Sequence, residues 1–190
     1  MKPLLYLAAA LLAGCATQPT NLVLKQIDTS AASSPVQIAP VSVSISSQDL
    51  RTETYLGRVR QQGEPALLLS PGNNPRQLME QALSNGLTQL GYQVSAQANT
   101  QMALQLDKLQ VDVEQNTLDH QGNSVAAVTV TLSQAQRELV KRFAAKGKFT
   151  GVMAANAGQM ELELNNRVQQ LITAVLTDPE IHQFIQQGSQ

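Results

Sequence analysis

The sequence predicts an α+β domain in which an antiparallel sheet of about four strands carries two helices packed on one face. Three observations predict this class. Several stretches alternate apolar with polar residues, two stretches repeat apolar residues at helical spacing, and the stretches follow one another in the order β-α-β-β-β-α. A run of strands interrupted by helices is typical of an antiparallel sheet with its helices on one side.

Alternation locates the strands. Val41, Val43 and Ile45 alternate with serines, which predicts a half-buried strand, and residues 67–69 are expected to form a short one. Three longer strands follow, and a change of phase at Asp107 and Lys108 predicts a bulge in the first of them. Their inward residues are expected to be Met102, Leu104, Leu106, Leu109, Val111 and Val113, then Val128, Val130 and Leu132, then Leu139, Phe143, Ala145 and Phe149 within 137–151.

Capping signals locate the helices. Asn74 is a good N-cap, Pro75 suits the first helical position and Gly91 suits the position after the helix end. The apolar face of this helix is Leu78, Met79, Ala82, Leu83, Leu87 and Leu90. A second helix is expected over about 159–177, and Asp178 with Pro179 predicts the start of a short final helix.

The N-terminus resembles a lipoprotein export signal. One basic residue, Lys2, precedes an uncharged apolar stretch over 4–14, which is too short to span a bilayer. The stretch ends in Leu-Ala-Gly before Cys15, and this pattern predicts cleavage between Gly14 and Cys15 with attachment of diacylglycerol to the cysteine. Ala16 replaces the aspartate that retains lipoproteins in the inner membrane. We therefore expect an anchor in the outer membrane of a Gram-negative bacterium, with the domain facing the periplasm.

The remaining chain divides into two parts on composition. Residues 15–39 contain mainly Thr, Gln, Ser, Ala and Pro, which predicts a lipidated cysteine followed by a flexible tether. Residues 22–24 are an apolar island that either belongs to the tether or forms a short strand. Residues 40–190 are expected to form a single periplasmic domain.

Composition excludes some classes of function. Only 14% of the residues are charged and no basic run appears, so nucleic acid is not an expected partner. No glycine-rich phosphate loop is present and no cofactor is expected. Cys15 is the only cysteine, so we expect no disulfide within the chain.

Candidate catalytic residues are few. His120 and His182 have no histidine or cysteine at metal-ligand spacing, so we expect no metal site and read them as a turn residue and a helix-surface residue. No Gly-x-Ser-x-Gly motif supports a serine nucleophile. Acidic residues such as Asp112 and Glu114 share a strand face and are read as solvated. The sequence therefore predicts no catalytic residue and a protein that is not an enzyme.

Two groups of charged residues keep functional interest. Arg51, with Asp49 and Glu53, forms either a surface contact or a solvated turn. Arg142, Lys146 and Lys148 lie on one face of the last long strand. This second group either meets phosphates or carboxylates of the envelope or protects the surface of the sheet.

Several segments resemble one known family, the YajG-like outer-membrane lipoproteins. They are Leu-Ala-Gly-Cys-Ala at 12–16, Val-Ser-Ile followed by Asp-Leu-Arg-Thr at 49–52, Leu-Gly-Tyr at 90–92, Leu-Gln-Leu at 104–106 leading to Val-Asp-Val at 111–113, and the ending Val-Leu-Thr-Asp at 175–178 with Ile-His-Gln-Phe-Ile at 181–185. The resemblance covers nearly the whole mature chain but implies no catalytic residue. The implied layout also resembles auxiliary lipoproteins of envelope lipid transport, such as the lipopolysaccharide-assembly lipoprotein.

Three functions remain open from the sequence. The first is a non-enzymatic outer-membrane lipoprotein that binds or scaffolds another envelope component, its membrane contact being the acyl chains on Cys15. The second is an auxiliary protein of lipid or lipopolysaccharide transport with an apolar groove between helices and sheet. The third is an enzyme acting on cell wall or lipid, with a polar cleft that contains a histidine.

Overall fold

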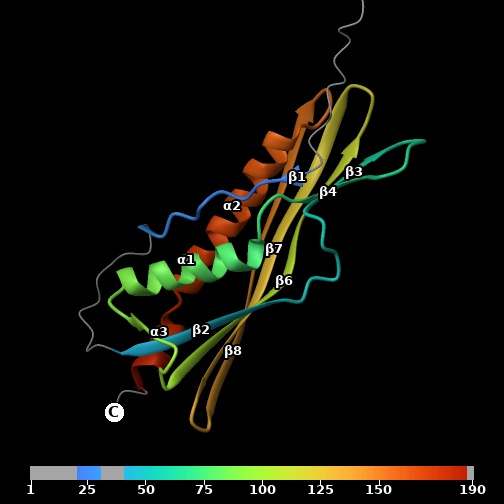
Figure 1. The fold of residues 1–190 in the computed structure, drawn as a ribbon. Helices are drawn as coiled ribbons and strands as arrows, with labels where there is room; N and C mark the ends of the chain where they lie inside the picture. The colour runs from blue at the N-terminus through green and yellow to red at the C-terminus, as the bar shows by residue number, and fades with distance from the viewer. Residues whose placement is uncertain (1–20, 31–40, 188–190) are drawn as a thin grey trace, which may run out of the picture.

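A long twisted sheet with helices on one side forms the domain (Figure 1). The computed structural model describes residues 21–30 and 41–187. Within these residues the chain forms β1 (Asn21–Leu22), β2 (Ser42–Asp49), β3 (Gly57–Gln61), β4 (Leu67–Pro71), α1 (Pro75–Gln89), β5 (Gln93–Val94), β6 (Thr100–Gln115), β7 (Asp119–Gln134), β8 (Arg137–Val152), α2 (Ala157–Leu176) and α3 (Pro179–Gln186).

Three 16-residue strands form the backbone of the sheet. β6 pairs antiparallel with β7 over its whole length, and β7 pairs antiparallel with β8. The predicted bulge is confirmed, because the register between β6 and β7 shifts between Leu106 and Lys108. Two consecutive residues, Asp107 and Lys108, therefore lie outside the strict alternation, and the apolar residues on both sides of the bulge still face the helices.

The other edge of β6 is shared by two strands. β2 runs parallel to the first half of β6, from Val43 opposite Thr100, and β3 runs parallel to its second half, from Gly57 opposite Val111. The loop over 50–56 leaves the sheet between them. β4 then pairs antiparallel with β3, β1 pairs parallel with β4, and β5 pairs parallel with β2.

The predicted antiparallel sheet of about four strands is therefore wrong. Within the described residues the sheet is mixed, has eight strands and curls around three helices. β3 was missed because Arg58 and Arg60 alternate with Gly57, Val59 and Gln61, which gives a polar stretch with no apolar alternation. Parallel pairing was missed because alternation shows which face a side chain takes and not which strand lies next to it.

The helices begin where their caps predict. The side chain of Asn74 accepts a hydrogen bond from the Gln77 N–H, and Asn156 accepts one from the Gln159 N–H at the start of α2. At the start of α3 the Asp178 carboxylate accepts from two backbone N–H groups. These side chains satisfy backbone donors that have no partner inside the helix.

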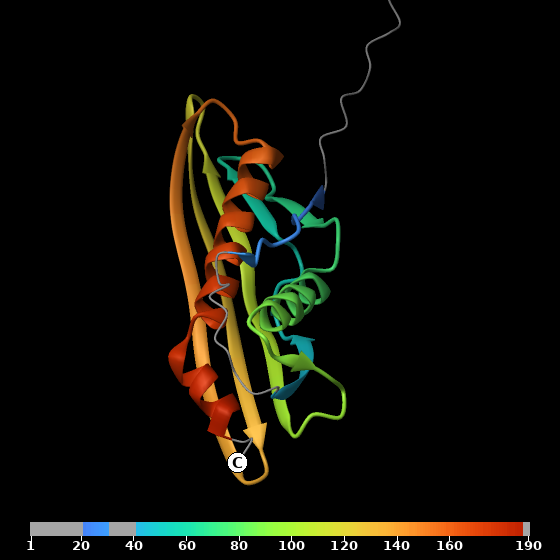
Figure 2. The same cartoon turned by 90° about the vertical axis from the view of Figure 1, so that its left-hand side faces the viewer.

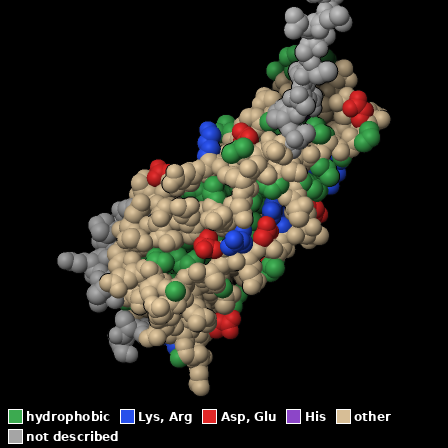
Figure 3. All heavy atoms as spheres, in the orientation of Figure 1, with side chains coloured by type: hydrophobic (Ala, Val, Ile, Leu, Met, Phe, Trp, Pro, Cys, Tyr) green, Lys and Arg blue, Asp and Glu red, His purple; other side chains and the backbone are tan. Residues whose placement is uncertain are grey.

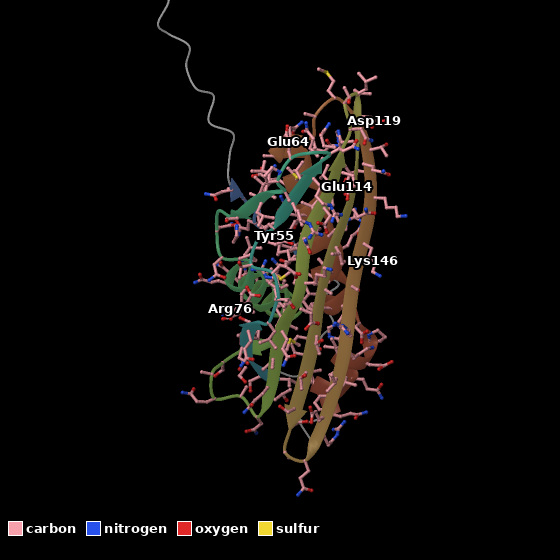
Figure 4. All side chains as sticks on the ribbon, turned by 90° about the vertical axis from the view of Figure 1, so that its right-hand side faces the viewer. Tyr55, Glu64, Arg76, Glu114, Asp119 and Lys146 are labelled. Carbon is pink, nitrogen blue, oxygen red and sulfur yellow. The ribbon has the colours of Figure 1, made fainter. Side chains whose placement is uncertain are left out.

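All three helices lie on one face of the sheet (Figure 2). The core between the two layers consists of fully buried Leu, Val, Ile and Met side chains from β6, β7, α1, α2 and α3. The opposite face of β6, β7 and β8 carries no helix (Figure 4), and we call it the open face. None of the helices in 21–30 and 41–187 combines the length and apolarity that a membrane-crossing helix needs.

Candidate functional site

His120 is a buried strand residue and not the turn residue that the sequence predicted. It lies in β7 with 3% of its surface exposed. Its Nδ1 donates to the Met153 carbonyl oxygen at 2.9 Å, and its Nε2 lies 2.9 Å from the side-chain amide of Gln159. Both ring nitrogens are thus occupied by groups of the chain, and His120 joins the loop after β8 to the start of α2.

His182 is likewise held between protein groups. Its Nε2 donates to the Leu176 carbonyl oxygen at 2.7 Å, and its Nδ1 lies 2.8 Å from the Tyr92 hydroxyl. With Nε2 as the donor, Nδ1 is left to accept a hydrogen bond from the Tyr92 hydroxyl, and burial raises the pKa of this phenol. The two rings also stack at 5.7 Å. Within the described residues no three His, Cys, Asp or Glu side chains are placed to hold a metal.

The space between helices and sheet is filled by side chains. Leu104, Leu106, Val128 and Leu171 are each at most 1% exposed. A void wide enough for an acyl chain would admit water-sized probes and expose the side chains around it, which these values contradict. The apolar groove that the lipid-transport alternative requires is therefore not present among these core residues.

Arg51 is folded onto Asp49 and does not extend into solvent. Its Nε and Nη2 donate to the two carboxylate oxygens of Asp49 at 2.9 and 2.8 Å, and its side chain is only 5% exposed. The hydrogen bond from Arg51 is the main reason that the pKa of Asp49 lies below its ordinary value. Arg51 thus closes the loop after β2 and is poorly placed to contact a partner.

A second charged group lies beside it. Arg76 of α1 donates to Ser47 at 2.7 Å and pairs with Glu80 at 3.0 Å. Blue and red side chains accordingly gather where α1 begins in Figure 3, whereas charges elsewhere on that view are sparse. These charged groups are paired with one another, so they form the polar contact through which α1 packs against β2.

The remaining three predicted residues lie on the open face. Arg142, Lys146 and Lys148 alternate along β8 with residues that face the helices. Arg142 is 72% exposed and lies 3.6 Å from Asp107 of β6. Lys146, labelled in Figure 4, lies opposite Val125 of β7, and Lys148 lies opposite Asn123.

The bulge of β6 adds Lys108 to these residues. Lys108 pairs with Ala127, two residues along β7 from Val125. Lys108, Lys146 and Lys148, which we call the lysine cluster, line one shallow depression of about 410 Å³. Small and neutral side chains of β7 lie between the three lysines. The sequence offered one signal for Lys108, the phase change, but alternation alone did not show which face the bulge would take.

The charges around the lysine cluster differ from it in being paired. Arg58 lies 2.6 Å from Asp112, Arg60 contacts Glu114, and Asp107 accepts a hydrogen bond from Thr129 besides its contact with Arg142. Tyr55 and Glu114, both labelled in Figure 4, belong to this paired region. None of the three lysines has an ion-pair partner among the described residues. The open face therefore presents three lysines without an ion-pair partner around one depression, and Asp112, which also lines it, is already paired with Arg58.

Comparison with known proteins agrees with the resemblance seen in the sequence. Residues 29–186 match the family described as Uncharacterized lipoprotein. The chain is 25% identical over 183 residues to the uncharacterized lipoprotein YajG of Escherichia coli strain K12, with 96% of this chain and 94% of that protein covered, and the match to YajG of Escherichia coli O6:H1 has the same values.

The fold also occurs among solved structures. Protein XCC0632 from Xanthomonas campestris superposes with a TM-score of 0.53 at 9% identity, over 83% of this chain and 93% of that one. At this identity the likeness concerns the fold alone. The family match over 29–186 extends over most of the chain, so the protein belongs to the YajG-like family of bacterial lipoproteins and is a membrane-anchored protein of the cell envelope.

Proposed function

We propose that this lipoprotein is anchored in the outer membrane through Cys15 and binds a negatively charged envelope component on its open face, without catalysing a reaction. The lysine cluster is the observation that carries the proposal. Three ammonium groups surround one depression, and the carboxylate that also lines it, Asp112, is paired with Arg58, so the lysines attract phosphates or carboxylates. Both kinds of anion occur in the envelope, and both are recognised by the same chemistry.

The packing of the domain supports binding over the two alternatives. The core residues leave no void for an acyl chain, which disfavours lipid carriage. His120 and His182 use both ring nitrogens on groups of the chain, which disfavours acid–base chemistry at either. The open face, by contrast, is broad, lies free of helices and carries the unpaired charge.

Cys15 and its surroundings lie outside the described residues, so the anchor rests on the sequence pattern. The single cysteine after Leu-Ala-Gly supports Cys15 as the attachment point, and Ala16 supports the outer membrane as the destination. Two or more acyl chains anchor a protein stably, because each buried methylene contributes about 0.8 kcal/mol. Replacing Cys15 with Ser should release the protein from the membrane fraction into the soluble periplasm.

Photocrosslinking in cells tests the binding face. A photoreactive residue in place of Ala144, exposed on the open face beside the lysine cluster, should capture an anionic envelope component, whereas one in place of Leu162 on α2 should not. Three exposed ion pairs at about 0.5 kcal/mol each sum to ~1.5 kcal/mol, so replacing all three lysines with Gln should lower capture roughly tenfold.

A matched control separates this effect from general loss of charge. Lys25→Gln removes one exposed lysine away from the open face and should leave capture unchanged, while Lys146→Gln alone should lower it. Equal capture by the triple variant and the wild type, or equal capture from positions 144 and 162, would refute binding at the open face. Mass spectrometry of the captured material then distinguishes peptidoglycan carboxylates from lipid phosphates.

A further inference from the structure

One end of the molecule exposes hydrophobic side chains that a soluble surface would normally bury. Leu118, Val152 and Met153 are 79%, 82% and 74% exposed, the highest values among the large hydrophobic residues that the structure describes. Leu118 belongs to the turn between β6 and β7, Val152 is the last residue of β8, and Met153 follows it. The Met153 N–H donates to the Leu118 carbonyl oxygen at 2.8 Å, so the three residues are neighbours. We call them the apolar tip.

The apolar tip is held in place by the residues beneath it. The Met153 carbonyl oxygen accepts hydrogen bonds from Gln115 Nε2 at 3.2 Å and from buried His120. Gln115 also accepts from the Ala155 N–H through its side-chain oxygen at 2.9 Å. Met153 itself has a φ of 62°, which costs about 1 kcal/mol or more for a residue other than glycine. Exposure of the three side chains is thus a consequence of a fixed and locally strained loop.

Few charges surround the apolar tip. Residues 115–118 and 153–160 contain no Asp, Glu, Lys or Arg. The nearest carboxylate along the chain, Asp119, lies at this end of the molecule in Figure 4 and accepts a hydrogen bond from Asn116 at 2.7 Å. Removing this end from water therefore exposes little charge to desolvation, which is the main cost of bringing a protein surface into lipid.

The chain direction brings the anchor to the same end. β6 and β3 run toward the apolar tip, so β4, which is antiparallel to β3, runs away from it, and β1 is parallel to β4. The chain therefore enters Asn21 from the side of the tip. Asn21 lies opposite Ser70, at the level of Gln110, and Asn116 is six residues farther along the strand, or about 20 Å.

The linker length matches that distance. Cys15 precedes Asn21 by six residue steps, which span at most about 21 Å when extended. The lipidated cysteine can therefore reach the level of the apolar tip and little beyond it. A membrane that holds the acyl chains must accordingly lie close to this end of the domain.

We infer that the apolar tip inserts into the boundary between headgroups and acyl chains of the same membrane that holds Cys15. This inference rests on the proposed anchor. Contact with lipid at two points, the acyl chains and the apolar tip, makes the long axis of the sheet rise from the membrane surface. The far end, with the turn between β7 and β8, then projects away from the bilayer, and the open face stands clear for a partner.

Tryptophan fluorescence tests the inference directly because the chain contains no Trp. Full-length acylated protein with Leu118→Trp or Val152→Trp is reconstituted into phosphatidylcholine vesicles with and without brominated acyl chains. We expect blue-shifted emission and roughly twofold or greater quenching by the brominated lipid, as for a side chain at the interfacial depth. Val140→Trp and Leu162→Trp, exposed by 56% and 57% away from the tip, should show neither effect.

A second variant ties the signal to the apolar surface. Leu118→Asn with Met153→Asn, in the Val152→Trp protein, should reduce quenching to the level of the controls, and Asn accepts the positive φ of Met153. Failure of the protein to sediment with vesicles would refute the anchor and this inference together. Sedimentation with tip and control tryptophans equally unquenched would refute the insertion alone. Shielding of the tip in native membranes but not in vesicles would identify a protein occupant and also overturn it.

Discussion

Ala135 occupies a backbone conformation that favours glycine. It is the first of two residues that join β7 to β8, between Gln134 and its partner Arg137, and its φ is 50°. A positive φ at the first position of a two-residue turn is where glycine is preferred in hairpins. Ala135→Gly should therefore raise the free energy of unfolding by about 0.5–1 kcal/mol in urea titrations.

The neighbouring residue supplies the control for this change. Gln136 has no positive φ, so Gln136→Gly adds backbone freedom to the unfolded chain without relieving strain. It should lower stability by about 0.5–1 kcal/mol. Stabilisation by both variants, or by neither, would contradict the assignment of strain to Ala135.

Asp178 gives the protein a specific dependence on acid. Burial disfavours its charged form, but Lys141 Nζ at 2.6 Å and the N–H groups of Ile181 and Glu180 outweigh burial and hold the pKa of the carboxyl below 3.8. A carboxyl with a depressed folded pKa contributes stability above its ordinary pKa and loses it as the pH falls through the folded value. This contribution should therefore be complete at pH 7 and disappear below about pH 3.8.

Asp178→Asn isolates this charge, because asparagine also caps helices well. At pH 7 we expect the variant to be about 0.5–1 kcal/mol less stable than the wild type. Urea titrations at a series of pH values should show the two proteins converging as the pH falls below 4, roughly the ordinary pKa of aspartate. A difference that is independent of pH would indicate a damaged cap instead of a lost ion pair.

At the scale of elements, the contact between α1 and α2 depends on one glycine. A Cβ built on Gly86 would lie 2.3 Å from a methyl carbon of the buried Leu176. Overpacking costs about 1–3 kcal/mol and exceeds the gain of up to about 1 kcal/mol that Ala brings to a helix. Gly86→Ala should lower the thermal unfolding midpoint. The adjacent exposed Asn85→Ala, which gains helix propensity alone, should leave it unchanged or raise it.

The helices and long strands could be predicted because their signals are local. Helix starts are predicted by Asn74, Pro75 and Asp178. Alternation along β7 and β8 correctly separated the buried face of each strand from its exposed face. The pairing of β2 and β3 along one edge of β6 depends on residues that are distant in sequence, so no local pattern contains it.

The candidate site was only partly predictable for the same reason. Lys146 and Lys148 were found from alternation, whereas Lys108 required knowing how the bulge pairs with Ala127. Arg51 was read as a surface residue because its pairing with Asp49 depends on the conformation of a loop. The apolar tip joins two turns that are about 35 residues apart in sequence, and exposed hydrophobic residues in turns give no signal until the turns are placed together.

At the scale of the whole molecule, an early segment of the chain, residues 21–30, is bound to α2. The segment crosses α2, and its backbone N–H groups donate to three side chains that are spaced one turn apart on that helix. Val23 donates to Glu161, Lys25 to Asn165 and Asp28 to Gln169. Leu22 and Leu24 are buried beneath it. These contacts fix where the chain leaves the domain toward Cys15, so they bear on how the protein stands at the membrane.

Limited trypsin digestion can measure how firmly the 21–30 segment is held, because cleavage after exposed Lys25 requires local opening. Asn165→Ala with Gln169→Ala removes acceptors for the N–H groups of Lys25 and Asp28, and these partly exposed hydrogen bonds contribute about 1–2 kcal/mol together. Cleavage at Lys25 should become roughly tenfold faster, since 1.4 kcal/mol corresponds to a factor of ten.

Asn166→Ala with Gln170→Ala removes the same residue types from exposed positions of the same helix and should leave the rate unchanged. Equal rates in both double variants would mean that the contacts with β4 and Asn73 and the burial of Leu22 and Leu24 hold the segment, and that Asn165 and Gln169 do not.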